Sequence, residues 1–358
     1  MMKRSVFGSE TIEGVWRASR LRLACASLLL LGTGCISIEL FEGGAAKPLE
    51  ESVLRGEEGP KILLIDIDGV IDGEPWTDSI FGGEALGMVA RVSEILDRAR
   101  EDPEVRALLL RIDTPGGAAT ASDQIHSEIL RFKRDRKVPV LAQLLSTATS
   151  GGYYIAMAAD AVRAHPTTVT GSIGVVYSSV SFAGLMEKLG IEDQSITSGE
   201  HKDMGSPLRR LQPEEREQLQ EIVNDLHARF RTIVEQGRPD LPAERIRELA
   251  DGRIYSASQA VENGLVDGLG TLDDAIRDLE SRLGVSRSRV VGYHRAGKPR
   301  RNIYSGSQVR GPGMTGSGLA DEPFAELSDL ARPLVLRKLA QLVSRPGFLY
   351  LWWPGIGD

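Results

Sequence analysis

The stretch VPVLAQLLSTATSGGYYIAMAA, residues 138–159, carries the pattern that decides the fold. Its apolar first part predicts a buried strand over Val138–Leu145, and Gly151–Ala159 predicts a short buried helix. The residues between them, Ser146–Ser150, are small and predict a tight corner. A strand that turns directly into a buried helix is typical of α/β architecture.

On both sides of this stretch, short apolar runs alternate with longer segments in which apolar residues recur at helical spacing. Further strands are predicted at Lys61–Ile67, Ala107–Ile112, Ala161–Ala164 and Val169–Val175, and helices at 84–101, Ser122–Arg134, Pro213–Gln236, 242–250 and Leu272–Leu283. This alternation predicts an α/β fold with parallel strand pairing. Length alone allows one large domain or two smaller ones.

Composition excludes several classes of function. The 358 residues carry a formal net charge of -7 with only 5% aromatic residues, so no nucleic-acid partner is expected. Both cysteines, Cys25 and Cys35, lie near the N-terminus, which excludes a cysteine nucleophile or a thiolate zinc site in the folded part. The histidines form no HExxH pattern, and no metal site is expected.

The N-terminus has the order of an export signal. Arg17, Arg20 and Arg22 precede the apolar run Leu23–Leu31, which leads into small residues and Cys35. Residues 1–35 are therefore predicted to be a signal segment, in which Cys35 resembles the lipid-modified cysteine of a bacterial lipoprotein. An uncleaved signal anchor and a buried helix are the alternatives. Residues 36–60 are predicted to be a tether.

The C-terminal part changes character. Gly, Ser, Arg and Pro dominate residues 291–322, which predicts a flexible linker. Residues 323–358 predict an amphipathic helix followed by a Trp-rich tail. This segment could lie on a membrane surface, or dock on the chain's own body or on a neighbour. Docking is the interpretation we favour, because the helix is short and its positive charge modest.

Ser150 is a candidate acyl-transfer nucleophile. At a strand-to-helix corner its hydroxyl lies beside a helix N-terminus, whose free N–H groups can stabilise an oxyanion. The alternative is a simple helix cap, for which serine is common. Gly116 and Gly117 follow a second buried strand, where their backbone N–H groups could face a ligand or simply form a turn.

A serine nucleophile also needs a base. The chain has no GxSxG motif, and no histidine has a supporting pattern. A lysine can serve near neutral pH if burial lowers its pKa by roughly three units from about 10.4. Lys202, within Ser198–Pro207, is the candidate; a solvated loop lysine is the alternative.

Four motifs in order resemble the signal peptide peptidase A family of serine proteases. They are Thr114-Pro115-Gly116-Gly117, Ser150-Gly151-Gly152-Tyr153-Tyr154, Thr170-Gly171-Ser172-Ile173-Gly174-Val175 and Ser198-Gly199-Glu200-His201-Lys202-Asp203, followed by a GLVD segment within 263–267. The resemblance covers roughly residues 61–285. Asp113 and Thr114 replace the Asn and Ser common in the family, and neither removes a proposed catalytic group.

This resemblance implies a site. Ser150 would be the nucleophile, Lys202 the general base, Ser172 the residue that orients the lysine amine, and Gly117 and Gly151 the oxyanion hole. It also implies a Clp-protease/crotonase-like spiral of ββα units in a single catalytic domain over 61–290. The chain resembles the short form of the family, in which serine and lysine come from adjacent subunits and an octameric ring is expected.

The resemblance further implies a membrane-associated endopeptidase that degrades cleaved signal peptides and other small apolar peptides without a cofactor. The export signal predicts a membrane-anchored protein facing the periplasm or another extracytoplasmic side. Two alternatives remain open at this point: a crotonase-type acyl-CoA hydratase or isomerase, and a membrane ring that binds peptides without cutting them.

Overall fold

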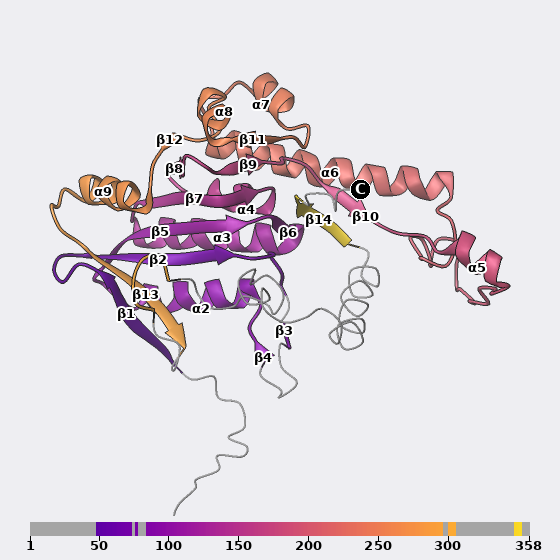
Figure 1. The fold of residues 1–358 in the computed structure, drawn as a ribbon, viewed down its shortest axis with the longest axis horizontal. Coiled ribbons are helices and arrows are strands. Elements are labelled where there is room, and N and C mark those ends of the chain that lie inside the picture. Colours follow the sequence, from indigo (N-terminus) through magenta and orange to yellow (C-terminus); the bar gives the residue numbers. More distant parts are fainter. Residues whose placement is uncertain (1–47, 74–75, 78–83, 296–299, 306–346, 353–358) are drawn as a thin grey trace, which may run out of the picture. The chain divides into compact units, whose positions relative to one another are not determined.

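The computed structural model describes residues 48–73, 76–77, 84–295, 300–305 and 347–352, drawn in colour in Figure 1. All of them belong to one compact unit, Pro48–Asp358. The predicted signal segment, with the predicted lipidation site Cys35, lies outside the described residues.

A nine-stranded sheet forms the centre of this unit (Figure 1). Its main path runs β1-β13-β2-β5-β7-β8-β12, and β9 and β11 extend it beside β7. The strands are β1 (Leu49–Arg55), β2 (Lys61–Asp68), β5 (Val105–Thr114), β7 (Val140–Thr149), β8 (Ala161–Ala164), β9 (Val169–Gly171), β11 (Ile254–Ser256), β12 (Gly268–Leu269) and β13 (Arg289–Arg295). Neighbouring strands from β13 to β12 pair in parallel, which confirms the predicted α/β class.

Two smaller sheets complete the strands. One pairs β3 (Trp76–Thr77) with β4 (Glu84–Ala85). The other has three antiparallel strands in the order β10-β14-β6, with bounds Val176–Ser178, Gly347–Leu351 and Gly116–Ala118. The second sheet pairs β14 with β6, which carries Gly117 of the predicted oxyanion hole.

Helices cover both faces of the central sheet. They are α2 (Met88–Arg100), α3 (Ala119–Arg136), α4 (Gly151–Ala156), α5 (Ala183–Leu189), α6 (Pro213–Gly237), α7 (Ala243–Leu249), α8 (Ala257–Glu262) and α9 (Leu272–Leu283). Side chains alternate across each strand, so β2 contributes Leu63 and Ile65 to one core and Ile62 and Leu64 to the other. The first core lies against α2, α3 and α4, and the second against α9.

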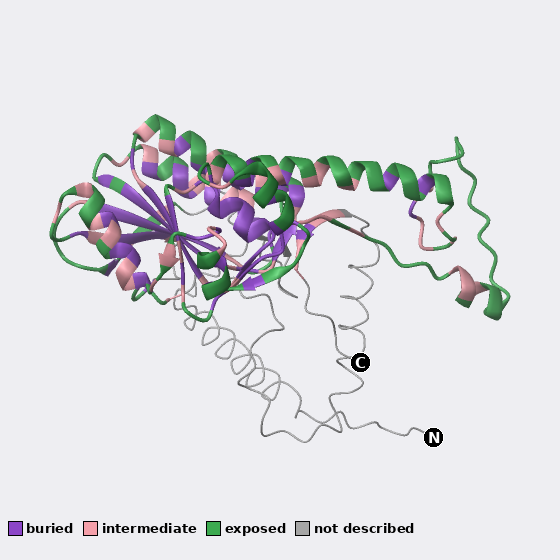
Figure 2. Ribbon diagram, turned by 90° about the horizontal axis from the view of Figure 1, so that it is seen from above, coloured by how far each residue is buried: buried purple, intermediate pink, exposed green. Residues whose placement is uncertain are grey.

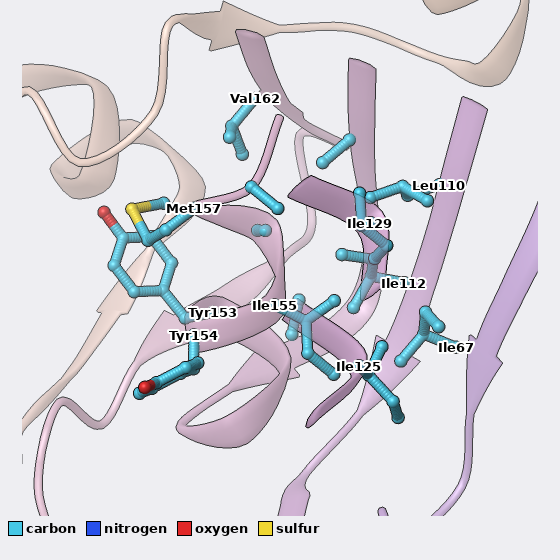
Figure 3. Close-up of a cluster of buried hydrophobic side chains, with 14 of the residues drawn as sticks. Ile67, Leu110, Ile112, Ile125, Ile129, Tyr153, Tyr154, Ile155, Met157 and Val162 are labelled. Carbon is cyan, nitrogen blue, oxygen red and sulfur yellow. The ribbon is translucent and has the colours of Figure 1, made fainter. Parts of the chain in front are cut away.

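Figure 3 shows part of the larger core, to which β2, β5, α3 and α4 contribute side chains. Ile67, Leu110 and Ile112 come from β2 and β5, and they face Ile125 and Ile129 of α3 and Ile155 of α4. Each of these six side chains is fully buried. This packing makes the start of α4 a fixed platform, because close-packed cores tolerate little displacement.

Helix α6 is only partly covered by the core. Phe230, Ile233 and Val234 in its C-terminal half are buried, whereas its N-terminal half is mostly exposed (Figure 2). The segment between β10 and α6, which includes α5, is also largely exposed. We call residues 179–212 the arm. Within the described ranges, no helix is both long and apolar enough to cross a membrane.

Two of the predicted segments contain ordered structure. Strand β1 lies inside the predicted tether over 36–60, where it pairs with β13. Strand β13 extends to Arg295 inside the predicted linker over 291–322, and Arg300 and Ile303 are buried there as well. The composition of both segments is typical of flexible chain. Pairing between strands some 240 residues apart orders the first segment, and pairing together with a buried ion pair orders the second.

The predicted Trp-rich tail includes β14, so its described part docks on the chain's own body. The amphipathic helix predicted before it lies outside the described residues. The predicted strand Val169–Val175 is also shorter than expected, because β9 ends at Gly171.

Candidate active site

Ser150 lies at the corner between β7 and α4. It is completely buried, and its backbone adopts φ 53° and ψ -114°, a conformation that non-glycine residues rarely adopt. Its side chain makes no capping hydrogen bond, and the buried Oγ has no partner among the described residues. The cap alternative therefore does not hold. An unpaired buried hydroxyl on a strained corner is the arrangement expected of a nucleophile awaiting its base.

Backbone N–H groups face this corner from two directions. Gly151 is the first residue of α4, where the N–H groups have no partner within the helix. On β6, Ile71 N donates to Gly116 O and Ala118 N donates to Ile71 O, both at 2.8 Å. These bonds use one edge of β6, so the Gly117 N–H points to the other edge. β6 lies against the start of α4, since a Cβ on Gly116 would lie 2.9 Å from Gly151 N.

The glycine residues are required by close backbone approach. A Cβ on Gly117 would lie 2.0 Å from Ile71 O, and a Cβ on Gly151 would lie 2.4 Å from the Ser122 hydroxyl. Gly116 also has a φ of 101°, which strongly favours glycine. The two hypotheses for this motif, a simple turn and N–H groups that face a ligand, are therefore compatible. The same glycines can form the turn and leave their N–H groups accessible.

Ser172 is held next to Ser150 through the backbone. Ser150 N donates to Gly171 O at 2.8 Å, and Ser172 N donates to Arg253 O at 2.8 Å. Ser172 also has a positive φ, 51°, and is buried. The predicted orienting serine therefore lies at the same corner as the predicted nucleophile.

Lys202 lies elsewhere. It is exposed in a turn near the N-terminus of α6, and Arg209 ties this turn to the helix through Asp203 and Glu215, at 2.7 and 2.5 Å. At 1.5 Å per residue, Glu215 and Phe230 on α6 are about 22 Å apart. Phe230 packs on Tyr154 of α4. The structure of one chain thus brings together Ser150, Gly151, Gly117 and Ser172, and does not bring Lys202 to them.

A polar cluster under α4 was missed by the sequence analysis. The Tyr154 hydroxyl donates to Asp123, which also accepts from Arg229 at 2.9 Å. Burial raises the pKa of Tyr154 and the bond to Asp123 raises it further. Burial alone would raise the pKa of Asp123, but these two donors lower it. Tyr154 comes one helical turn after Ser150, and this spacing could have predicted that its side chain lies beneath the site. Nothing in the sequence indicated a role for Asp123.

The described residues contain no group of three or more His, Cys, Asp or Glu side chains that could hold a metal ion. The side chains that do meet at the site are hydroxyls, backed by backbone N–H groups. Such an arrangement can stabilise a tetrahedral oxyanion in acyl transfer.

Comparison with known proteins supports this chemistry. Residues 132–286 match the model of peptidase family S49. The chain is 36% identical over 250 residues to the Enterococcus faecium protein named "Putative signal peptide peptidase SppA", an alignment that covers 70% of this chain and 72% of the relative. It is 31% identical over 295 residues to the chloroplastic serine protease SPPA of Arabidopsis thaliana, covering 74% of this chain and 43% of that one.

A solved structure of a mutant of the 1510-N membrane-bound stomatin-specific protease also aligns, with a TM-score of 0.40, 16% identity, and coverage of 62% of this chain and 84% of that one. The family match spans α4, the Ser172 corner and the arm, and the Enterococcus relative aligns along most of its own length. The chain therefore belongs to peptidase family S49 and is a serine protease related to the SppA signal peptide peptidases.

Proposed function

We propose that this chain is a membrane-associated endopeptidase that cleaves small apolar peptides, including signal peptides already released from their proteins. In this proposal Ser150 is the nucleophile and Lys202 of a neighbouring subunit is the general base. The observation that carries it is the unpaired, buried Ser150 Oγ at a strained corner, with Lys202 of the same chain on an exposed arm. The acyl-CoA alternative does not fit a member of a peptidase family.

A second copy of the chain is the natural source of the lysine. Arg209 ties the turn of Lys202 to Glu215 at the start of α6. Glu215 lies about 22 Å along α6 from Phe230, which packs on Tyr154, and no lysine side chain spans that distance. The turn around Lys202 is nevertheless ordered by the Arg209 ion pairs, which hold the pKa of Glu215 down at about 2. An ordered turn that presents a lysine away from its own nucleophile suits delivery to another subunit.

The arm also carries apolar side chains that one chain leaves in solvent. Those exposed by more than a third are Val180, Phe182, Leu185, Leu189, Ile191, Ile196 and Leu208. Exposed apolar groups gathered on one segment commonly mark a protein interface. We propose that they pack between subunits of a ring, an octamer by analogy with the short form of the family, and thereby carry Lys202 to a neighbour's Ser150.

The proposed reaction is acyl transfer. Neutral Lys202 takes the Ser150 proton while Oγ attacks the peptide carbonyl carbon, and the N–H groups of Gly117 and Gly151 receive the oxyanion. Ser172 orients the lysine amine. The C–N bond then breaks as the protonated lysine gives its proton to the leaving amine. Lys202, neutral again, then takes a proton from water as the water oxygen attacks the ester carbonyl carbon. The bond between Oγ and the acyl carbon breaks, Ser150 regains a proton from the lysine, and the carboxylate product leaves.

The membrane assignment rests on the sequence of residues 1–35. We propose that this segment exports the protein and that lipid on Cys35 holds it at the membrane, so that the active site faces the periplasm or another extracytoplasmic side. Apolar peptides concentrate at such a surface, which fits the proposed substrates. Mass spectrometry of the intact mature protein tests this part, because a lipid on Cys35 adds a defined mass to its N-terminus.

The catalytic assignment is tested on the full-length, detergent-solubilised protein with an internally quenched apolar peptide and a fluorophosphonate probe. Ser150→Ala and Lys202→Ala should each lower peptide cleavage by at least about a thousandfold. The matched controls, Ser286→Ala and Lys137→Ala, change exposed residues outside the arm and should leave cleavage unchanged. Probe labelling that persists in Ser150→Ala, or cleavage that survives in Lys202→Ala, would contradict the assignment.

A further inference from the structure

The position of α4 depends on contacts with the rest of the fold. The helix has six residues, Gly151–Ala156, and no side chain caps its start. Helices of this length are not stable on their own, so tertiary packing sets the direction in which α4 points. That direction sets the aim of its first N–H groups, including the Gly151 N–H that we propose as an oxyanion-hole donor. Whatever holds α4 in place therefore influences the reaction at Ser150.

Tyr153 ties α4 to a distant part of the chain. Its side chain is completely buried, and its hydroxyl donates to the carbonyl oxygen of Leu265 at 2.7 Å. Burial raises the pKa of Tyr153 to about 12, although the Arg238 guanidinium acts in the opposite direction. The hydroxyl therefore keeps its proton at neutral pH and stays a hydrogen-bond donor. Leu265 belongs to the GLVD segment, residues 264–267, to which the proposed mechanism gives no role.

The GLVD segment is itself fixed to two other elements. Its Asp267 carboxylate accepts from Val162 N of β8 at 2.6 Å, and Asp267 N donates to Val162 O at 2.8 Å. The same carboxylate accepts two bonds, at 2.9 and 3.0 Å, from the guanidinium Nη1 of Arg238, the residue that follows α6. Arg238 is buried, and charge-assisted bonds of this kind are among the strongest in proteins. The Leu265 carbonyl is therefore a rigid acceptor.

Tyr154, the next residue of α4, forms a second tie in another direction. Its hydroxyl donates to Asp123 of α3. Figure 3 shows the rings of Tyr153 and Tyr154 leaving α4 along different paths. One hydrogen bond leaves a short helix free to rotate about that bond, whereas two bonds in different directions resist the rotation. The pair of tyrosines thus fixes the orientation of α4 and, through it, of Gly151.

We propose that Tyr153 is a positioning residue for the proposed oxyanion hole, and that the GLVD segment is its anchor. The inference rests on the proposed function, because it takes Ser150 as the nucleophile and Gly151 as an oxyanion-hole donor. Without the bond from Tyr153 to Leu265, α4 keeps its place in the core but its N-terminus turns. The transition state then loses part of the stabilisation from the Gly151 N–H, while the bound peptide, which carries no oxyanion, loses little.

The test removes the hydroxyl and keeps the ring, with Tyr153→Phe in the full-length, detergent-solubilised protein. We measure kcat and KM for an internally quenched apolar peptide, counting active sites by fluorophosphonate labelling, and the affinity for the aldehyde of the same peptide. A peptide aldehyde forms a tetrahedral adduct with the serine and so reports on the oxyanion hole. We expect kcat to fall at least about tenfold, KM to stay within about twofold, and aldehyde affinity to fall by about the same factor as kcat.

Tyr293→Phe is the matched control. Tyr293 is a buried tyrosine of β13, and its hydroxyl donates to Asp102 at 3.2 Å. In the sheet order, β2 and β5 separate β13 from β7, the strand that ends at the Ser150 corner. This variant also loses a buried hydroxyl bond, so it should lower the urea midpoint of unfolding much as Tyr153→Phe does. It should leave kcat and aldehyde affinity unchanged, and this contrast separates positioning from a general loss of stability.

Asp267→Asn tests the anchor without touching α4. It weakens the bonds to Arg238, and it should lower kcat and aldehyde affinity together, with KM again near wild type. It also decides the question if Tyr153→Phe does not fold. Wild-type kcat and aldehyde affinity in the variant that is measured, or equal losses in Tyr293→Phe, would overturn the positioning role and leave the proposed function standing. A wild type that shows neither Ser150 labelling nor cleavage would overturn the proposed function itself.

Discussion

The backbone N–H of Ser150 donates to the carbonyl of Gly171 at 2.8 Å, and this bond joins the two corners of the active site. It extends the parallel pairing of β7 with β9, in which Thr149 lies opposite Gly171. The residues that follow each strand, Ser150 and Ser172, both have positive φ angles. The proposed nucleophile and the proposed orienting serine are therefore fixed by one sheet edge, independent of the arm that carries Lys202.

Gly171 should tolerate no side chain. Its φ is 86°, and a Cβ would lie 2.5 Å from Tyr255 Cδ2 and 3.0 Å from Arg253 O. Gly171→Ala should lower the free energy of unfolding by roughly 2–4 kcal/mol, because conformational strain and overpacking add. It should also lower peptide cleavage by shifting Ser150. Urea unfolding and peptidase assays measure the two effects.

The matched control for this prediction is Gly284→Ala. Gly284 also has a positive φ, 69°, but a Cβ there would meet open space. Its substitution should cost only about 1 kcal/mol and leave cleavage unchanged. Equal losses of stability in the two variants would contradict this prediction, because they would show that the neighbours of Gly171 move aside at no cost.

Mixing the two inactive variants should restore activity. If serine and lysine come from different subunits, random assembly of Ser150→Ala and Lys202→Ala chains gives both groups in about a quarter of the sites. Peptide cleavage should then recover to about a quarter of the wild-type rate after the chains are unfolded, mixed and reassembled. A mixture of Lys202→Ala with the Ser150→Ala/Lys202→Ala double variant lacks Lys202 in every subunit and serves as the control. A mixture that stays inactive would place both groups within one subunit.

Arg209 should act as a positioning residue for Lys202. Its guanidinium donates to Asp203, next to Lys202, at 2.7 Å and to Glu215 on α6 at 2.5 Å. Arg209→Ala should free the turn and lower kcat roughly 10- to 100-fold, since catalysis depends on close placement of the base. KM should change little, because Lys202 acts in the chemical step and the proposed peptide contacts at Gly117 and Gly151 are unchanged.

Arg277 provides the control, since its ion pair with Asp274 on α9 is exposed and remote from the arm. Exposed pairs of this kind contribute at most about 1 kcal/mol, so Arg277→Ala should leave both stability and kcat near wild type. A comparable kcat loss in the two variants would show that the effect of Arg209 is not local.

Local patterns were sufficient to predict most of the fold. The predicted helix Leu272–Leu283 agrees with α9 at both ends, and Pro213–Gln236 agrees with α6 to within one residue. Both begin with strong start signals, a Thr271 capping box and a proline in the first turn. The corner at Ser150 was predictable for the same reason, because its small residues lie between two clear apolar runs.

Long-range partners could not be predicted in this way. Arg300 lies in a segment of linker-like composition, yet it pairs with Asp66 at 3.1 Å, and Asp66 also pairs with Arg111 at 2.7 Å. All three side chains are buried. The attraction between the opposite charges compensates for the hydration that each charge loses on burial. Likewise β14 pairs with β6 across more than 200 residues. No local period distinguishes such segments from flexible chain, since their stability comes from residues far away in sequence.

His126 should make the fold less stable in acid. The ring is almost fully buried beneath Tyr154, at a centroid distance of 5.4 Å, and burial lowers its pKa to about 4, although Asp123 nearby acts in the opposite direction. Between about pH 6.5 and pH 4 the unfolded chain therefore binds a proton that the folded chain excludes. Folding stability should fall with falling pH across this window, and His126 should contribute up to about 3 kcal/mol of the loss.

His126→Phe removes the titrating group and leaves no unpaired ring nitrogen in the core. Urea unfolding of the wild type and the variant from pH 8 to pH 4 should therefore give parallel stabilities above about pH 7 and a shallower fall for the variant below it. The region above pH 7 is the internal control, because any difference there reports altered packing against Tyr154 and not protonation. If both proteins lost stability with the same slope between pH 6.5 and pH 4, the buried ring would have to accept its proton in the folded state, and the packing under α4 would be looser than the structure shows.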